Sequence, residues 1–282
     1  MSAPRVFDRK HYESLNSSRW AVVSTLLSEL KEPLALETAV DIGCGLGYFS
    51  GLLQSAGLQV SAVDGRAENV EEARRRLPQI TFQQCDAEDA ALQKLGTFDL
   101  VFCFGLLYHL ENPLLAIRHL RAMTGRLLLV EGVIFPGDEP IMGLVDEGPT
   151  EDQGLNHFAF YPTEACLQKM LYRAGFGFVY RFAQMPEHPG YRSGRSTRKI
   201  RTMLAASPAP IDSKLLVPVP EPSATIQPWI IQPTAPYRLF YASKTRCRAS
   251  LQMLINVTYP IRRVLGLRRA NWGLNRGKNL TR

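Results

Sequence analysis

The chain has 282 residues, of which 45% are hydrophobic and 21% are charged, a composition typical of a globular protein that excludes an intrinsically disordered chain. No apolar run approaches the roughly 18 residues that a membrane-spanning helix needs. Residues 1–10 also lack the apolar core of a secretory leader. We therefore expect a cytoplasmic protein, and the basic C-terminus leaves peripheral attachment to a membrane open.

The net charge of +7 is unevenly distributed along the chain. Residues 237–282 hold 11 of the 33 cations and no Asp or Glu, so the preceding residues carry 22 cations against 26 acids, a net charge of −4. The basic character therefore belongs to the C-terminal segment. Residues 1–236 show no electrostatic signature of nucleic-acid binding.

Hydrophobic periodicity and turn residues predict that helices and strands alternate along the chain. An amphipathic helix is expected first, over residues 11–30. The predicted strands are residues 38–42, 58–63, 80–84, 98–104 and 126–130, with helices at 48–56 and 67–77 and a further helix from Asn112-Pro113. After a helix that starts at Thr163, residues 176–182 and 198–205 are predicted to form a closing strand pair. This order predicts an α/β fold with a doubly wound, mostly parallel, seven-stranded sheet.

Composition divides the chain into further segments. Residues 1–37 are predicted to form an N-terminal helical cap, and residues 38–206 the main domain. Residues 132–162 are rich in Gly, Pro and acidic residues and are too long for an ordinary connection, so we expect an insertion that covers the substrate. A Pro-rich linker (207–236) and a basic amphipathic tail (237–282) follow.

The glycine-rich sequence Asp41-Ile-Gly43-Cys-Gly45-Leu-Gly47 directly follows the first predicted strand and opens a helix. Glycines at this place allow a tight turn and a close approach of the backbone to a ligand. Their spacing differs from the dinucleotide-binding fingerprint, which requires a glycine where Tyr48 stands. Asp64 ends the second strand, where a carboxylate can accept both hydroxyl groups of a ribose.

Taken together with the acidic turn at Asp86, these residues resemble the class I S-adenosylmethionine-dependent methyltransferases over residues 38–206. The resemblance implies a Rossmann-like methyltransferase fold and S-adenosylmethionine as the cofactor. It implies that the three glycines line the methionine part, that Asp64 binds the ribose, and that Asp86 binds the adenine edge. The complete set of expected cofactor contacts is Asp41, Gly43, Gly45, Gly47, Asp64, Gly65, Arg66, Asp86, Ala87, Glu88, Phe104 and Tyr108. A dehydrogenase is the alternative, and no metal site is expected.

A second resemblance rests on Gly105-Leu-Leu-Tyr108-His109, on residues 133–139 and on residues 156–163. These segments are similar to the tRNA wobble-uridine carboxymethyl transferases, which implies that Tyr108 and Arg201 contact the cofactor. Residues 1–37 lack the Trp-Arg-Lys-Gly type of segment with which that family reads the extra carboxylate of carboxy-S-adenosylmethionine. Ordinary S-adenosylmethionine is therefore the favoured cofactor.

Three residues are candidates for acid–base chemistry. His109 follows the fourth strand, Glu131 ends the fifth, and His157 lies in the acidic insertion. An imidazole or carboxylate at these places can remove the proton of a hydroxyl acceptor. Each also has a structural interpretation: His109 orienting its helix, Glu131 ending its strand, and His157 packing among aromatic residues.

The favoured function is methyl transfer to an oxygen or nitrogen atom of a small-molecule or glycan (sugar-type) acceptor. One alternative is a tRNA-modifying enzyme that holds RNA with its basic tail. Another is a non-enzymatic scaffold whose tail docks on an anionic membrane surface or a partner. The tail can equally pack against the acidic body, and the sequence sets neither the acceptor nor the oligomeric state.

Overall fold

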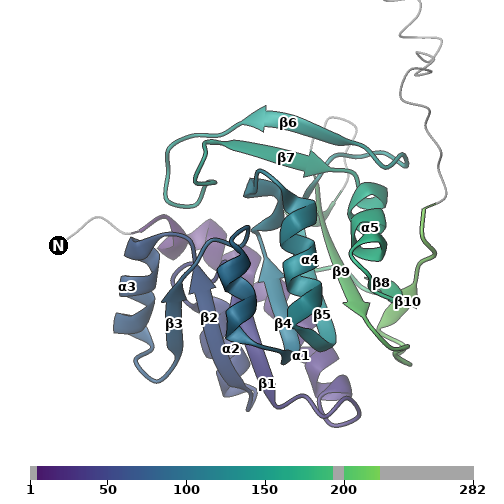
Figure 1. Cartoon of the computed structure of the whole chain (residues 1–282), viewed down its shortest axis with the longest axis horizontal. Helices are drawn as coiled ribbons and strands as arrows, with labels where there is room; N and C mark the ends of the chain where they lie inside the picture. Colours follow the sequence, from purple (N-terminus) through teal and green to yellow (C-terminus); the bar gives the residue numbers. More distant parts are fainter. Residues whose placement is uncertain (1–4, 193–199, 223–282) are drawn as a thin grey trace, which may run out of the picture. The chain divides into compact units, whose positions relative to one another are not determined.

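The protein is built around an eight-stranded mixed sheet (Figure 1). The computed structural model describes residues 5–192 and 200–222. Its strands are β1 (Thr38–Ile42), β2 (Gln59–Asp64), β3 (Thr81–Gln84), β4 (Phe98–Phe104), β5 (Thr124–Ile134), β8 (Phe178–Phe182), β9 (Ile200–Ser207) and β10 (Leu216–Pro218). Their order in the sheet is β10-β8-β9-β5-β4-β1-β2-β3. Strands β1 to β5 are parallel, and β8, β9 and β10 pair antiparallel. The strand order reverses at β1, and ligands of such sheets bind beyond the carboxyl ends of the strands at that point.

The expected α/β sheet and its closing strand pair are confirmed, but the expected count of seven strands is corrected to eight. The additional strand, β10, lies inside the predicted Pro-rich linker. Leu216 pairs with Phe182 and is buried, and the N–H of Val219 donates to the carbonyl of Val179 at 2.9 Å. Backbone pairing and apolar burial thus hold residues 216–219 on the sheet. Residues 223–236 and the predicted tail (237–282) lie outside the described residues.

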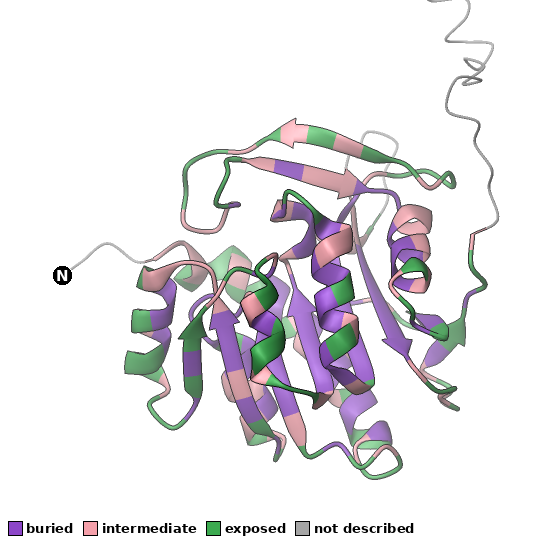
Figure 2. Cartoon of the chain, in the orientation of Figure 1, coloured by how far each residue is buried: buried purple, intermediate pink, exposed green. Residues whose placement is uncertain are grey.

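Helices cover both faces of the sheet. The first face is covered by α1 (Lys10–Leu30), α2 (Tyr48–Ser55) and α3 (Ala67–Arg76), and the second by α4 (Pro113–Met123), α5 (Glu164–Arg173) and the short helix η2 (Ala90–Leu95). Alternate residues of each strand face opposite layers, so Phe102 packs on the first face and Val101 on the second. The buried residues accordingly follow the strands and the inner sides of the helices (Figure 2).

The predicted N-terminal cap is largely a core helix. Val23 and Leu26 of α1 are fully buried against the first face of the sheet. Burial of one such side chain contributes about 1.5–3 kcal/mol, so α1 belongs to the folded core. Only the start of α1 and the preceding 3-10 helix η1 (Val6–Asp8) reach the carboxyl end of the sheet, where they line a cavity.

Local sequence signals explain where the helices of the second face begin. The side chain of Asn112 accepts a hydrogen bond from the N–H of Leu115 at 3.1 Å, and Pro113 occupies the first turn of α4. Thr163 caps α5 in the same way through the N–H of Cys166 at 3.2 Å. Both helix starts agree with the sequence-based prediction.

The predicted insertion contains a two-stranded antiparallel sheet of β6 (Met142–Asp146) and β7 (Phe158–Pro162). Strand β5 continues to Ile134, so the chain leaves the main sheet later than residue 132. The hairpin lies across the end of the sheet toward which the parallel strands point (Figure 1). The ring centroid of Tyr161 lies 5.7 Å from that of Tyr108, which attaches the hairpin to the body. We call the connection between its strands, residues 147–157, the lid loop.

A membrane-spanning helix and a metal-binding cluster are both absent from the described residues. No helix there is long and apolar enough to cross a membrane. In the same part of the chain, no group of three or more His, Cys, Asp or Glu side chains is arranged to hold a metal ion.

Candidate active site

The glycine loop after β1 forms the floor of a cavity of about 550 Å³. Gly43, Gly45 and Gly47 have φ angles of +77°, +55° and +85°, in the left-handed region that favours glycine. A Cβ atom at Gly43 would also lie only 3.0 Å from the side chain of Leu106, and one at Gly47 only 3.0 Å from Leu77. At Gly43 and Gly47 both the backbone conformation and the lack of room for a side chain require glycine. The backbone of the loop therefore faces the cavity without side chains at these positions.

The Asp64 carboxylate, at the end of β2, lines the same cavity. One oxygen accepts the N–H of Gly45 at 2.9 Å, and the other accepts the N–H of Arg66 at 2.9 Å and the side-chain amide of Asn69 at 3.1 Å. Burial raises the pKa of Asp64, although these hydrogen bonds act in the opposite direction. The side chain is thus fixed beside the glycine loop, as the sequence predicts for a ribose-binding carboxylate.

The acidic turn after β3 also faces the cavity, through Asp86, Ala87 and Glu88. The two oxygens of Glu88 accept the N–H groups of Glu111 and Asn112 at 2.9 and 2.6 Å, so this carboxylate fixes the chain that leads into α4. Phe104 and Gly65 complete this part of the wall.

Arg66 connects the end of β2 to the lid loop. Its guanidinium donates to the carbonyl groups of Gln153 and Gly154 at 3.0 and 3.2 Å, and it lines the cavity.

Asp41 is placed differently from the sequence-based expectation. It does not line the cavity but lies behind the glycine loop, only 2% exposed, where it accepts a 2.6 Å hydrogen bond from the Ser50 hydroxyl. Burial raises the pKa of Asp41 to about 7, and the nearby charge of Asp64 adds to the effect. Asp41 therefore joins the loop to the start of α2 through Ser50.

His109 lines the cavity and is held by a carboxylate of the lid loop. Its Nδ1 lies 2.6 Å from Oε2 of Glu147, whose side chain is 3% exposed and also accepts the N–H of Gly154 at 3.0 Å. A carboxylate partner places a proton on Nδ1 and leaves Nε2 as the proton-accepting nitrogen of the ring. Sequence reasoning missed Glu147, which appeared only as one of several acids in the insertion.

Glu131 lies in a buried ion cluster and not on the cavity wall. Its side chain has no exposed surface, and its oxygens lie 2.8 Å from Arg19 and 2.9 Å from Arg201, with the Tyr191 hydroxyl donating at 2.7 Å. Although burial opposes it, the two guanidinium groups lower the pKa of Glu131. Glu131 is therefore a fixed anion that positions Arg19 and Arg201, both of which line the cavity.

The structure brings together Tyr108 and Arg201, which the sequence separates by 93 residues. The guanidinium donates to the Tyr108 hydroxyl at 3.3 Å and lies 5.8 Å from the ring centroid. Both line the cavity, as the resemblance implies for residues that contact the cofactor.

His157, which was expected to contact the acceptor, lies outside the cavity lining. Its side chain is exposed and does not line the cavity, and its φ angle is +60°. Its carbonyl accepts the N–H of Glu147 at 2.9 Å, so its backbone shapes the lid loop.

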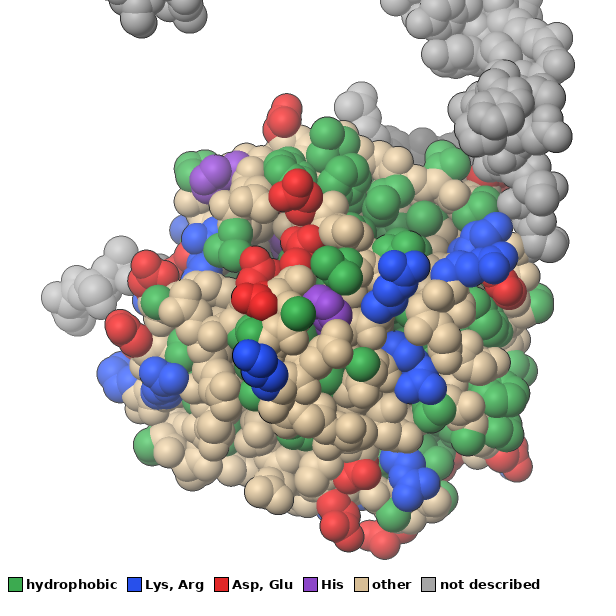
Figure 3. All heavy atoms as spheres, in the orientation of Figure 1, with side chains coloured by type: hydrophobic (Ala, Val, Ile, Leu, Met, Phe, Trp, Pro, Cys, Tyr) green, Lys and Arg blue, Asp and Glu red, His purple; other side chains and the backbone are tan. Residues whose placement is uncertain are grey.

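Acidic side chains gather around the mouth of this region. Seen from one face, they collect beneath the hairpin, whereas exposed apolar side chains lie above them (Figure 3). The lid loop contributes Glu151 and Asp152 to the cavity lining, and the turn after β3 contributes Asp86 and Glu88.

Strand order, glycine loop and ribose-type carboxylate together define the class I methyltransferase fold, and the comparisons agree. Residues 40–127 match the family model described as methyltransferase domain. This match agrees with the resemblance to the class I S-adenosylmethionine-dependent methyltransferases that the sequence motifs carry.

Curated relatives match part of the chain. A ubiquinone biosynthesis O-methyltransferase from Xanthomonas oryzae pv. oryzae is 33% identical over 131 residues, which is 45% of this chain and 51% of that protein. A tRNA U34 carboxymethyltransferase from Tolumonas auensis is 29% identical over 167 residues, covering 56% of this chain and 48% of that protein. The chain thus spans about half the length of the curated relatives it matches.

Solved structures share the fold at lower identity. The N-terminal domain of EvdMO1, crystallised in the presence of SAH and D-fucose, superimposes with a TM-score of 0.55 at 18% identity, covering 71% of this chain and 84% of that one. Magnesium protoporphyrin IX methyltransferase from Synechocystis PCC 6803 gives a TM-score of 0.50 at 22% identity, covering 74% and 86%.

Proposed function

We propose that this protein binds S-adenosylmethionine in the cavity over the glycine loop and transfers its methyl group to an oxygen or nitrogen atom of a small-molecule or sugar-type acceptor. The observation that carries the proposal is that Asp64 and the glycine loop share one cavity with His109, whose Nδ1 lies 2.6 Å from Oε2 of Glu147. A cofactor site and an acid–base pair therefore meet at the carboxyl end of the sheet.

The residues present fit this cofactor. Asp64 would accept the ribose hydroxyl groups, and Asp86 lies where it would face the adenine. The two guanidinium groups of Arg19 and Arg201 share the single carboxylate of Glu131, which leaves one positive charge beside the cavity. This extra positive charge would attract the carboxylate at the methionine end of the cofactor, because an uncompensated charge beside a buried site favours binding of the opposite charge.

The cofactor, when bound, supplies a methyl group already activated by its sulfonium. The chain then has to position the acceptor and remove a proton. Cavity walls that fix the acceptor can lower the barrier by about 7–11 kcal/mol through orientation. Nε2 of His109 would accept the proton of a hydroxyl acceptor, and Glu147 would stabilise the imidazolium that forms; general-base catalysis contributes about 10²–10⁴-fold.

The charge around the cavity supports a small acceptor. Glu147, Glu151 and Asp152 of the lid loop lie beside it, and carboxylates there would repel a phosphate-rich polymer. The proposed test is calorimetry with S-adenosylhomocysteine, followed by mass spectrometry of small-molecule mixtures incubated with deuteromethyl-labelled cofactor. Absence of cofactor binding by the folded protein would overturn the proposal.

A tRNA-modifying activity is the second candidate. It is supported by the Tyr108–Arg201 contact, because the resemblance to the tRNA carboxymethyl transferases implies cofactor contacts for both residues. Under this alternative the basic residues 237–282 would hold the RNA. Filter binding of bulk tRNA at low salt separates the candidates: equal affinity with and without residues 237–282 would eliminate the second.

A further inference from the structure

We propose that residues 5–12, here called the N-terminal strap, close over the cofactor site, and that Asn69 couples this closure to the ribose carboxylate Asp64. This proposal rests on the proposed function, because it assumes that the cofactor binds at Asp64. It assigns positioning roles to Arg5, Asn69 and Glu151.

The strap covers the glycine loop. Phe7, Asp8 and Tyr12 all line the cavity. The ring of Phe7 lies 3.5 Å from the place that a Cβ atom on Gly45 would take. A ligand bound along the glycine loop would therefore contact the strap, and movement of the strap away from the loop would open the cavity further.

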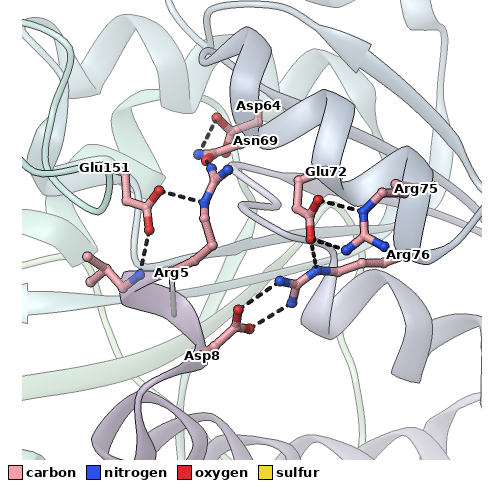
Figure 4. Close-up of polar contacts among 9 residues, drawn as sticks. Arg5, Asp8, Asp64, Asn69, Glu72, Arg75, Arg76 and Glu151 are labelled. Carbon is pink, nitrogen blue, oxygen red and sulfur yellow. Dashed lines mark hydrogen bonds and ion pairs between the residues drawn. The ribbon is translucent and has the colours of Figure 1, made fainter. Parts of the chain in front are cut away.

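Charged contacts hold the strap to two separate elements (Figure 4). Asp8 pairs with Arg76 of α3 through two contacts of 2.7 and 2.8 Å. Arg5 pairs with Glu151 of the lid loop at 2.7 Å, and the N–H of Val6 donates to the same carboxylate. Arg5 and Glu151 are 31% and 24% exposed, and ion pairs at such positions are individually weak. Closure is thus made of contacts that can break and re-form.

A further contact joins the strap to the lid loop on the acceptor side. The Tyr12 hydroxyl donates to Asp152, and both side chains line the cavity. The closed strap and the lid loop therefore form one continuous wall beside the space left for the acceptor.

Asn69 connects the strap to the cofactor side. Its side chain is almost fully buried, its carbonyl oxygen accepts Arg5 at 3.1 Å, and its amide donates to Asp64 at 3.1 Å (Figure 4). Arg5 only donates and the Asp64 carboxylate only accepts, so a single orientation of the Asn69 amide satisfies both partners. Asp64 is already held by Gly45 and Arg66, and a ribose bound to it would restrain the Asn69 amide further. That restraint favours the closed position of Arg5 and, through Glu151, of the lid loop.

The coupling predicts that the cofactor binds before the acceptor. Cofactor binding would complete the wall made by Tyr12 and Asp152, and the closed strap would slow cofactor release. Both effects are measurable without knowledge of the acceptor.

Limited trypsin digestion of the full-length protein tests closure, because Arg5, Arg9 and Lys10 place three cleavage sites on the strap. We expect saturating S-adenosylhomocysteine to slow cleavage of the wild type at these sites. In Asn69→Ala and Glu151→Gln we expect the protection to be lost and the dissociation rate of S-adenosylhomocysteine to rise about two- to fivefold, the scale of one partly exposed charged contact.

The control is Glu221→Gln, which removes a 2.9 Å ion pair with Arg173 that involves neither the strap nor the cavity. Glu151 is partly exposed and its replacement by Gln keeps the size of the side chain, so Glu151→Gln keeps the test valid if Asn69→Ala, at a buried position, fails to fold. Ligand binding without strap protection, or equal dissociation rates in Glu151→Gln and Glu221→Gln, would overturn the closure proposal alone. Absence of any ligand binding by the wild type would overturn the proposed function and the closure proposal with it.

Discussion

Nδ1 of His109 lies 2.6 Å from Oε2 of Glu147, which joins the cavity wall after β4 to a lid loop 38 residues further along the chain. The same oxygen of Glu147 accepts the N–H of Gly154, which closes the lid loop on itself. The ring orientation of His109 is thus set by the lid loop, and under the proposed function Nε2 of that ring would accept the proton.

The first prediction concerns this pair. We expect His109→Ala to lower kcat by about 10²–10⁴-fold for a hydroxyl acceptor, because it removes the proton acceptor. Glu147→Gln is expected to lower kcat less, since the imidazole remains but loses its charged partner. The dissociation constant of S-adenosylhomocysteine, measured by calorimetry, should stay within about twofold in both variants. Normal turnover in His109→Ala would remove His109 from the mechanism.

The second prediction concerns the ribose carboxylate. Asp64→Ala should weaken binding of S-adenosylhomocysteine by about 1–3 kcal/mol, because the hydroxyl groups of the ligand lose a buried partner. A matched control is Asp99→Asn, which changes a carboxylate that is bonded to Thr38 and does not line the cavity. Calorimetry of both variants checks the prediction. Equal affinities in the two would contradict a ribose contact at Asp64.

The third prediction follows from the raised pKa of Asp41, about 7 against an ordinary value of 3.8. Between these values the folded protein binds a proton that the unfolded chain has released, so the free energy of unfolding falls as the pH rises. About three pKa units correspond to a loss of about 4 kcal/mol as an upper bound. Urea denaturation from pH 4.5 to 8 should show this decline in the wild type and a smaller one in Asp41→Asn, whose amide oxygen can still accept from Ser50. Parallel curves for the two proteins would argue against a buried, titrating Asp41.

The fourth prediction separates a structural from a catalytic Glu131. In Glu131→Gln the buried Arg19 and the half-buried Arg201 lose their shared counter-charge, and removing the buried partner of such ion pairs costs about 3–5 kcal/mol. Urea denaturation measures the loss. Wild-type stability combined with a loss of kcat would instead support the acid–base role that strand position alone had suggested.

The fifth prediction concerns His157, whose side chain is exposed and outside the cavity lining. We expect His157→Ala to change kcat by less than about twofold, because surface substitutions away from a site have small effects. His109→Ala, assayed in parallel with the same acceptor, provides the comparison. A large fall in kcat for His157→Ala would mean that the lid loop turns its imidazole toward the acceptor during turnover.

Much of the fold could be predicted because the signals are local. The alternation of strands and helices, the glycine loop and the position of Asp64 depend on spacings of a few residues, and the structure confirms them. The short strand β10 was missed, since three residues among prolines give no periodic pattern and become a strand only by pairing with β8.

Only one part of the cavity lining was predictable from the sequence. Gly43, Gly45, Gly47 and Asp64 are fixed by the first two strands and by the turns that follow them. The contact between His109 and Glu147 depends on the lid loop, whose path no local pattern encodes. That is why Glu147 was missed and why His157, which shares the same segment, was assigned a role that its exposed side chain does not support.

The sequence by itself determined that the chain forms an α/β fold with a mostly parallel sheet, with a glycine loop after the first strand and Asp64 at the end of the second. The tertiary structure decided which distant charges meet: His109 with Glu147, Arg19 and Arg201 with Glu131, and Arg5 with Glu151. The physical reason is that backbone geometry and apolar periodicity act over one or two turns. A buried ion pair, by contrast, depends on how separate elements pack. The local sequence around a charged residue therefore does not indicate which residue it will pair with.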